Sequence, residues 1–490
     1  MLVYDNADDP RLDIVSFFPR CYKGTIIVTS RNRDLGHLVS AYHLEIGPMR
    51  EHEALAVLLR SAHRTLPLPK EEHDAAIQLT SELGCLAVAL AQVGGYCHQM
   101  SSTTAKRTGA FTFEKYLRLF MSHRPTLMRK DAPQSLEHYR RGAYTTLDLS
   151  YSALSRVARK FLHLISCFHY SDISLKTFAF AARHRFAVKK DHIDRPAIHE
   201  SLTEGLDSIL CPEGPGIWDE LYVYNLIQEL CSFSFLSTTV VSDIIFLQIH
   251  PLMRGWAQDM LPRPEADLYD QMAARLLASS ITNGERIMYQ YIVQHIISIQ
   301  DRVDLLNIRF SDRMAFAEVL GNFGYYERAE AIYKHSATYL EQTRGRNHQS
   351  TVLTLSSLAE MYYRQGKWNE AEKLQVEVLE ARKKALGDED TLTFTAMSRL
   401  SATYRQLERW DESEQLQVRA LNHSRAVLGS DHPYTLSFAT QLASIYRHQG
   451  QWEKAANLEV SVLEINMRTM GPDHLDTINA QFNLGTTLYY

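Results

Sequence analysis

Two polar residues follow short apolar runs near the start of the chain, where a side chain can meet a ligand. Asp5 follows the run at residues 2–4, and Arg31 follows the β-branched run at residues 24–30. Runs of this kind predict buried parallel strands. Because open α/β sheets bind ligands at the carboxyl ends of their strands, Asp5 and Arg31 predict a ligand-binding edge.

The sequence lacks the motifs of several catalytic sites. It has no Gly-x-x-x-x-Gly-Lys-[Ser/Thr] string, so no nest of backbone amides and no lysine would hold nucleotide phosphates. Its 21 histidines form no His-Glu-x-x-His or similar ligand spacing, and no catalytic triad is visible. We predict that the chain is not an enzyme and does not hydrolyse ATP.

The second half of the chain repeats itself with a period of 42 residues. Apolar residues recur at spacings of three and four on both sides of a short polar turn, which predicts two antiparallel helices per unit. One helical hairpin cannot bury its apolar face alone, so stacked hairpins should form a superhelix with a concave groove. The positions that repeat are Gly345, Gly387, Gly429 and Gly471; Tyr326, Trp368, Trp410 and Trp452; and Phe316, Leu358, Leu400, Leu442 and Leu484.

This repeat resembles the tetratricopeptide repeats of kinesin light chains. The connector Gly429-x-x-His432-x-x-Thr435 matches the connector of that long, 42-residue variety. The resemblance covers residues 309–490 and implies an α-α superhelix that binds proteins or peptides. The tryptophan, glycine and leucine positions are expected to be core and turn residues. The array stops inside a first helix, as a truncated array would.

The groove should be lined near the end of each first helix, by analogy with the family. These positions differ between repeats, and they form a mildly basic set that would favour an acidic peptide. A solvated helix face is the alternative. The predicted groove residues are Tyr363, Arg364, Arg405, Gln406, Arg447 and His448.

The first part of the chain resembles the NB-ARC family of signal-transducing ATPases. The segment Ile46-Gly47-Pro48-Met49 resembles one NB-ARC signature, and residues 83–90 resemble another, with Ala87 in place of its proline. The resemblance implies the end of a nucleotide-binding domain at residues 1–45, with its Walker B and sensor strands, and a helical domain at 46–135. Asp5 would then orient Mg²⁺ or water, and Arg31 would sense the γ-phosphate of a nucleotide.

The rest of that domain, with its phosphate loop, would precede Asp5 by roughly a hundred residues in such a family. Both a start codon placed inside a longer gene and a natural truncation would give the present chain.

Residues 143–262 resemble the winged helix of the same proteins, and residues 263–308 are expected to be a helical linker. His250 matches the histidine of the Met-His-Asp motif, which contacts the ADP β-phosphate in resting NB-ARC proteins. A structural cap is the alternative role, because Pro251 begins a helix there. DNA binding by this domain is not expected, since no Lys or Arg lies between Pro196 and Met253.

Composition sets the broad class of the protein. The chain of 490 residues is 45% hydrophobic and 22% charged, which is typical of several globular domains. Its net charge of -5 disfavours a dedicated nucleic-acid or membrane binder. Six widely spaced cysteines suit a reducing compartment, and no signal peptide or membrane-spanning run is present, so we expect a cytoplasmic protein.

Together these patterns predict a mainly α protein: a partial α/β P-loop remnant, a helical domain, a winged helix and a superhelix of tetratricopeptide repeats. The predicted function is that of a fungal-type, NLR-like regulator, or a fragment of one, coupling an ADP/ATP switch to protein-binding repeats. ADP or ATP with Mg²⁺ would be the cofactor of an intact family member, and a homo-oligomer is implied. A kinesin-light-chain-like scaffold with no nucleotide function is the alternative.

Overall fold

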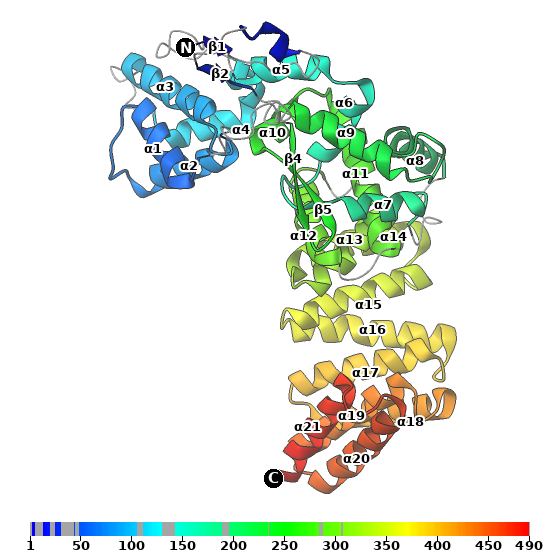
Figure 1. The fold of residues 1–490 in the computed structure, drawn as a ribbon. Helices are drawn as coiled ribbons and strands as arrows, with labels where there is room; N and C mark the ends of the chain where they lie inside the picture. Colours follow the sequence, from blue (N-terminus) through cyan, green and yellow to red (C-terminus); the bar gives the residue numbers. More distant parts are fainter. Residues whose placement is uncertain are drawn as a thin grey trace. The chain divides into compact units, whose positions relative to one another are not determined.

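A computed structural model of the chain is mainly helical and forms two compact units, residues 1–315 and 316–490 (Figure 1). It describes residues 2–4, 13–19, 25–30, 44, 49–104, 111–129, 143–188, 196–233, 235–283, 288–304 and 307–489. Among these residues, every strand lies in unit 1, and unit 2 consists of helices and the turns that join them.

Unit 1 begins with two short parallel strands. β1 (Leu2–Tyr4) pairs in parallel with β2 (Ile26–Val28), and the 3₁₀ helix η1 (Ile14–Phe17) lies between them in sequence. The strands were expected to be buried, but Val3 is 51% exposed and Ile27 is 42% exposed. Among the described residues, this sheet consists of these two strands.

A group of helices follows, in which α1 packs against α3 and α2 packs against α4. Glu53 at the third position of α1 accepts a hydrogen bond from the backbone of Arg50 at 2.9 Å, which satisfies a free amide at the start of that helix. The bounds of these helices are α1 Glu51–Ser61, α2 Lys70–Glu82, α3 Ala87–Thr104 and α4 Phe113–Arg129.

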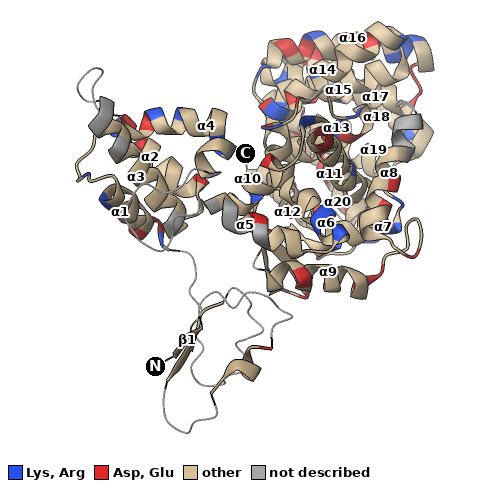
Figure 2. Ribbon diagram, turned by 90° about the horizontal axis from the view of Figure 1, so that it is seen from above, with Lys and Arg blue, Asp and Glu red and all other residues tan. Residues whose placement is uncertain are grey.

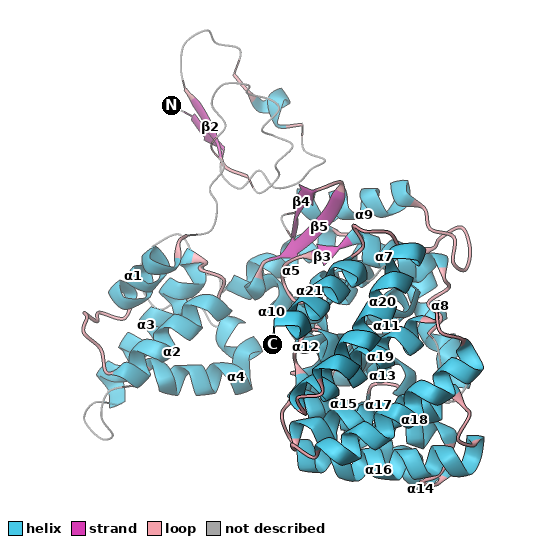
Figure 3. Ribbon diagram, turned by 90° about the horizontal axis from the view of Figure 1, so that it is seen from below, coloured by secondary structure: helices cyan, strands magenta, loops and turns pink. Residues whose placement is uncertain are grey.

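The remainder of unit 1 packs helices around a three-stranded antiparallel sheet of order β3-β5-β4 (Figure 3). Trp256 of α10 is fully buried there, stacks on Phe235 and donates its indole N–H to Asp148 at 2.9 Å. The elements are α5 Ala143–Ala153, α6 Arg156–Ser166, β3 Ile173–Ser174, α7 Leu175–Arg183, α8 Pro196–Leu210, α9 Glu220–Ser232, β4 Leu236–Val241, β5 Ile244–Ile249, α10 Pro251–Asp259, α11 Arg263–Asn283 and α12 Tyr289–Gln300.

Unit 2 consists of successive helical hairpins, each packed against the next. α13 (Phe310–Asn322) spans the division between the units. The helices of the 42-residue repeats are α14 Tyr326–Arg344, α15 Gln349–Arg364, α16 Trp368–Leu386, α17 Thr391–Gln406, α18 Trp410–Leu428, α19 Pro433–His448, α20 Trp452–Thr469 and α21 Leu475–Tyr489. The helices α15, α17, α19 and α21 are called the first helices of the repeats, and α14, α16, α18 and α20 are called the second helices.

Each repeated residue of the connector between repeats has a structural role. Gly345, Gly387, Gly429 and Gly471 follow or closely follow the second helices with φ of +90°, +87°, +89° and +88°, a conformation that favours glycine. The histidine three residues later caps the next first helix. His432, for example, accepts a hydrogen bond from the amide of Tyr434 at 3.2 Å. In one connector Asp390 takes this role, accepting from Leu392 at 2.8 Å.

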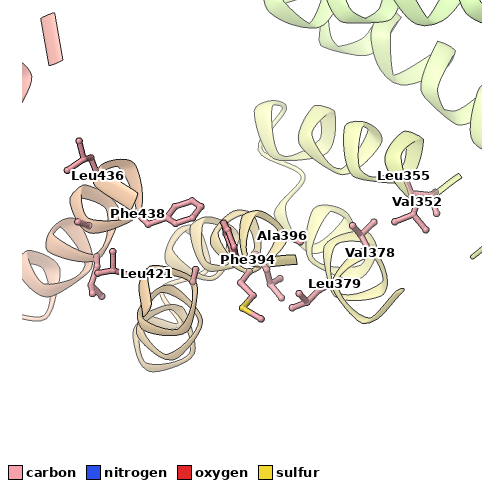
Figure 4. Packing of buried hydrophobic residues seen from close by; sticks show 14 of the residues in the cluster. Val352, Leu355, Val378, Leu379, Phe394, Ala396, Leu421, Leu436 and Phe438 are labelled. Carbon is pink, nitrogen blue, oxygen red and sulfur yellow. The ribbon is translucent and has the colours of Figure 1, made fainter. Parts of the chain in front are cut away.

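The repeated leucines and tryptophans differ in burial. Leu358, Leu400 and Leu442 are at most 5% exposed, so they belong to the core as expected. Trp368 and Trp452 begin second helices and remain 37% and 36% exposed. Figure 4 shows part of the shared core, where Phe394 of one repeat meets Phe438 of the next with ring centroids 6.0 Å apart.

Successive repeats are also joined by a repeated glutamate. Glu330 accepts hydrogen bonds from Lys334 of its own helix, and from Gln365 and Lys367 in the following turn at 2.8 and 3.0 Å. One and two repeats later, Glu372 accepts from Arg409, and Glu414 accepts from Gln449. Burial opposes the charge of Glu330, but its three donors outweigh this effect and lower its pKa to about 2.

Candidate functional site

The first helices form a polar surface along the repeats, here called the first-helix face. Side chains on neighbouring first helices are joined by hydrogen bonds across this face. The bonded pairs are Ser398 with Gln441, Arg399 with Ser356, Arg405 with Ser444, and Gln406 with Tyr363.

Three of the predicted groove residues take part in these bonds, and a fourth lies beside them. Arg405 donates to Ser444 at 3.3 Å, and Gln406 and Tyr363 are 3.5 Å apart. Arg364 is exposed and forms an ion pair with Glu360, one turn earlier in α15, at 2.8 Å. Arg405 has no ion pair among the described residues.

The two predicted residues of α19 are engaged with other parts of unit 2. Arg447 pairs with the buried carboxylate of Glu459 at 3.0 Å and donates to the carbonyl of Asn483 at 3.2 Å. His448 packs its ring on Trp410, with centroids 4.8 Å apart. The side chain of Arg447 therefore joins α19 to α20 and α21.

A hollow of about 460 Å³ opens between α19, the end of α20 and α21. Asn466 in its wall is 4% exposed, and its Oδ1 has no hydrogen-bond partner among the described residues. Its Nδ2 donates to the carbonyl of Asp476 at 3.2 Å. The residues that line the hollow combine amides and hydroxyls with apolar side chains: Pro433, Leu436, Ser437, Thr440, Gln441, Val462, Asn466, Met470, Asp476, Asn479, Ala480, Phe482 and Asn483.

The residues that line the hollow differ from those predicted from the sequence. The predicted set lies at the carboxyl ends of the first helices, whereas the hollow is lined by their beginning and middle, for example at Ser437 and Gln441. The feature of the sequence that could have indicated the hollow is the pair Asn479 and Asn483, one helical turn apart in a helix with many apolar residues. Amides with this spacing also occur on many solvated helices, so the pair alone does not predict a site.

The first-helix face carries positive charge. Arg399 is exposed and has no ion pair among the described residues. Burial and, to a smaller extent, the positive charge of Arg399 lower the pKa of the nearby Arg382 to about 10. An anionic group bound near Arg399 would relieve this repulsion.

His250 lies at the start of α10, where its ring contacts the loop after α2. Its Nδ1 accepts a hydrogen bond from the amide of Leu252 at 3.2 Å, so it caps α10. Its Nε2 donates to the carbonyl of Gly84 at 2.9 Å. Burial lowers the pKa of His250, which favours this neutral form.

The other end of α10 is also bonded to the preceding helices. Asp259 accepts two hydrogen bonds from Arg124 of α4, at 2.8 and 2.7 Å, and one from Tyr144 of α5 at 2.9 Å. A second hollow, of about 440 Å³, opens beside this pair. Arg302 and Asp270 in its wall form an ion pair, so its charges are largely matched within the protein.

Of the three residues predicted to contact a nucleotide, the structure describes His250. Asp5 and Arg31 lie outside the described residues, and so do residues 46–48 of the first NB-ARC signature. Both ring nitrogens of His250 are bonded within the protein. In the part of the chain that the structure describes, no group of three His, Cys, Asp or Glu side chains could hold a metal ion. None of the described helices has the length and apolar character needed to cross a bilayer.

Comparison with protein families confirms the tetratricopeptide repeats. Two family models, both described as tetratricopeptide repeat, match residues 392–466 and 439–490, and residues 351–391. No model of the NB-ARC family matches, so the resemblance of the first half stays a prediction. None of the curated proteins compared with the chain matches it.

Several solved structures resemble parts of the chain. The putative kinesin light chain of Podosopora anserina, with nearly identical repeats, shows 22% identity over 36% of this chain and 84% of its own, with a TM-score of 0.34. A signal transduction ATPase with numerous domains and a tetratricopeptide repeat sensor, from Pyrococcus horikoshii, shows 13% identity. That match covers 99% of this chain and 65% of the other, with a TM-score of 0.35.

Proposed function

We propose that the chain is a scaffold whose repeats bind a protein or an extended peptide along the first-helix face. The observation that carries this proposal is Asn466, a buried amide whose Oδ1 lacks a partner at the wall of the 460 Å³ hollow. A buried acceptor without a donor costs stability, and a ligand N–H group would satisfy it after a small movement of the side chain that opens the atom to the hollow. The backbone of a peptide supplies such groups.

The chemistry of the face indicates the kind of peptide. Phe482 is 74% exposed and lines the hollow, so an apolar side chain of the ligand can be buried against it. Arg399 and Arg405 have no carboxylate partner among the described residues, so they favour an acidic residue nearby. We propose a peptide with one apolar side chain and at least one carboxylate.

Selection of peptides from a random displayed library against the full chain tests this function. Phe482→Ala and Arg399→Glu should weaken the selected peptides by about tenfold each, because they remove an apolar contact and invert a charge. Val427→Ala and Arg419→Glu are matched controls, since both residues are exposed on the second helix α18. Equal losses in test and control variants would contradict binding at the first-helix face.

We also propose a second function, a conformational switch of the NB-ARC kind in unit 1. It is supported by the two ends of α10, where His250 bonds Gly84 and Asp259 bonds Arg124. These bonds, together with that from Arg124 to the carbonyl of Gly255, join α10 to the helices α1–α4, so a switch would have to break them. In this proposal residues 143–262 form a winged helix; the order α6, β3, α7, α8, α9, β4, β5 supports that assignment.

Thermal unfolding with and without Mg-ADP tests the switch. A nucleotide that binds the folded chain should raise its unfolding temperature in proportion to the logarithm of nucleotide concentration. His250→Gln should reduce that rise if His250 contacts the nucleotide. An unchanged unfolding temperature at millimolar Mg-ADP would refute a nucleotide function, and the scaffold would be the remaining proposed function.

The remaining properties follow from the same two proposals. We propose that the chain does not hydrolyse ATP, that it works in the cytoplasm and binds neither nucleic acid nor membrane, and that the switch acts through a homo-oligomer. A fungal origin is proposed on the resemblance alone. Light scattering of the full chain at several concentrations tests the oligomer, and a dilution-independent monomer would contradict it.

A further inference from the structure

One face of α9 is apolar although it is exposed. Leu221 is 68% exposed and Tyr224 is 37% exposed, and they lie three residues apart on the same face of the helix. Ile217, two residues before the helix cap at Asp219, is 49% exposed. These three residues are called the α9 patch. The opposite face of α9 is the one that packs into the core, through Val223, Leu226, Ile227 and Leu230.

The loop that carries Ile217 is held in place by its own bonds. The amide of Gly216 donates to Asp207 at 3.1 Å, and the amide of Ile217 donates to the carbonyl of Gly214 at 3.0 Å. Gly216 has a φ of +76°, and a Cβ at this position would lie 2.6 Å from Cγ of Arg185. A surface that is already ordered loses little conformational entropy when a partner binds it.

The segment of the sequence that carries the α9 patch is acidic. The sequence between Pro196 and Met253 contains no Lys or Arg, and the charged residues on α9 are both acidic (Figure 2). Glu220 accepts a hydrogen bond from the hydroxyl of Tyr224 at 2.7 Å, which places a carboxylate at the edge of the patch. The acidic residues of this segment are Glu200, Glu204, Asp207, Glu213, Asp219, Glu220, Glu229 and Asp243.

This combination of an apolar centre and an acidic rim defines the partner. Negative charge disfavours DNA and anionic membranes, and it favours a partner with Lys or Arg around an apolar stripe. The side chains of Leu221, Tyr224 and Gln228 form a ridge at spacings of three and four, which fits the grooves of another helix. The basic residue Arg185 packs along Gly216 and so borders the patch.

We propose that the α9 patch binds an amphipathic helix of a partner protein, with an apolar stripe flanked by Lys or Arg. The apolar stripe covers Leu221 and Ile217, and the basic side chains meet the acidic rim. This surface lies in unit 1 and is independent of peptide binding at the first-helix face. Either proposal can fail without the other.

A model amphipathic helix provides the probe. A fluorescein-labelled peptide of Leu and Lys, with its leucines at spacings of three and four, is titrated with the full chain at physiological salt. A peptide of the same composition, scrambled to lose the stripe, is the control ligand. Fluorescence anisotropy should show saturable binding of the amphipathic peptide and at least tenfold weaker binding of the scrambled one.

Two variants locate the binding. Leu221→Ser should weaken the amphipathic peptide by about tenfold, because it removes the most exposed apolar side chain of the patch. Leu268→Ser is the matched control: Leu268 is 42% exposed on α11 of the same unit, and its loss should leave binding within twofold. Glu213→Lys should weaken binding severalfold, and the loss should shrink at high salt.

A direct measurement covers the case in which a variant alters folding. Hydrogen exchange of the wild-type chain should slow in residues 217–228 when the amphipathic peptide is added. Equal binding of both peptides, equal effects of the two leucine variants, or protection elsewhere in the chain would each overturn the proposal.

Discussion

At the scale of single residues, the contact between His250 and Gly84 shows how a histidine that begins a helix also fixes a distant loop. Gly84 has a φ of +59°, and a Cβ there would lie 2.4 Å from Cε1 of His250. The glycine is therefore required twice, for its backbone conformation and for the space that the imidazole ring occupies.

Gly84→Ala should lower the free energy of unfolding by clearly more than Gly366→Ala. Gly366 also has a positive φ, of +75°, but a Cβ there would meet nothing within 4 Å. Gly366→Ala, the control, should lower the free energy of unfolding by about 1–2 kcal/mol through the backbone conformation alone. Gly84→Ala should lower it further, because the new methyl group must displace His250. Urea unfolding followed by tryptophan fluorescence measures both, and equal losses would contradict the role of the close contact.

A buried ion pair gives a second prediction at this scale. Arg275 of α11 and Asp312 of α13 are 0% and 1% exposed and lie 3.1 Å apart. Asp312→Ala should destabilise unit 1 by about 3–5 kcal/mol, because it takes this counter-ion away from a buried guanidinium. Asp431→Ala is the control, since its pair with Arg468 is exposed and should contribute below about 1 kcal/mol. Similar effects of the two variants, in urea titrations, would contradict this interpretation.

At the scale of elements, the repeated glutamate explains how one hairpin is attached to the next. Glu330 is 8% exposed and receives its hydrogen bonds from the turn that follows α15. Ala456 stands at the corresponding position of α20. The bonds of Glu330 add to the apolar core that the repeats share.

The low pKa of Glu330 predicts how this junction responds to acid. Its pKa is lowered from 4.5 to about 2 in the folded chain. Its contribution to the free energy of unfolding is therefore complete above pH 4.5 and is lost as the pH falls toward 2. Glu330→Gln should reduce stability by about 1–2 kcal/mol at pH 7 and should flatten the dependence on pH between 4.5 and 2. Denaturant titrations at several pH values provide the test, and an unchanged pH dependence in the variant would refute it.

At the scale of the whole molecule, the two units should respond differently to mild acid. Burial lowers the pKa of several histidines in unit 1: that of His163 to about 4, that of His295 to about 3, and those of His169 and His250 below the ordinary value of 6.5. His163 and His295 bond backbone carbonyls at Ala257 and Asp172.

Unit 1 should therefore lose stability as the pH falls from about 6.5 to 4, because the unfolded chain takes up protons that the folded histidines exclude. The loss of stability that arises from Glu330 in unit 2 begins only below pH 4.5. Hydrogen exchange of the full chain at pH 7, 5.5 and 4.5, read separately for peptides of each unit, measures this order. Earlier loss of protection in unit 2 would contradict it.

The sequence alone determined the repeats of unit 2. Their helices depend on contacts between residues three or four apart, on left-handed glycines such as Gly429 and on caps such as His432, and all of these are local in the chain. A signal that is local and written several times can be found without a structure. Some polar positions of the first-helix face could also be predicted, and Arg405 is one of them.

Only the tertiary structure decided which distant residues meet. His250 bonds a carbonyl 166 residues away, and Asp259 bonds an arginine 135 residues away. Arg447, which the repeat pattern places at the groove, pairs with Glu459 of the next helix, while the buried amide of Asn466 borders the hollow. Such contacts depend on how helices pack and on which charges that packing buries, and no spacing within the sequence encodes them.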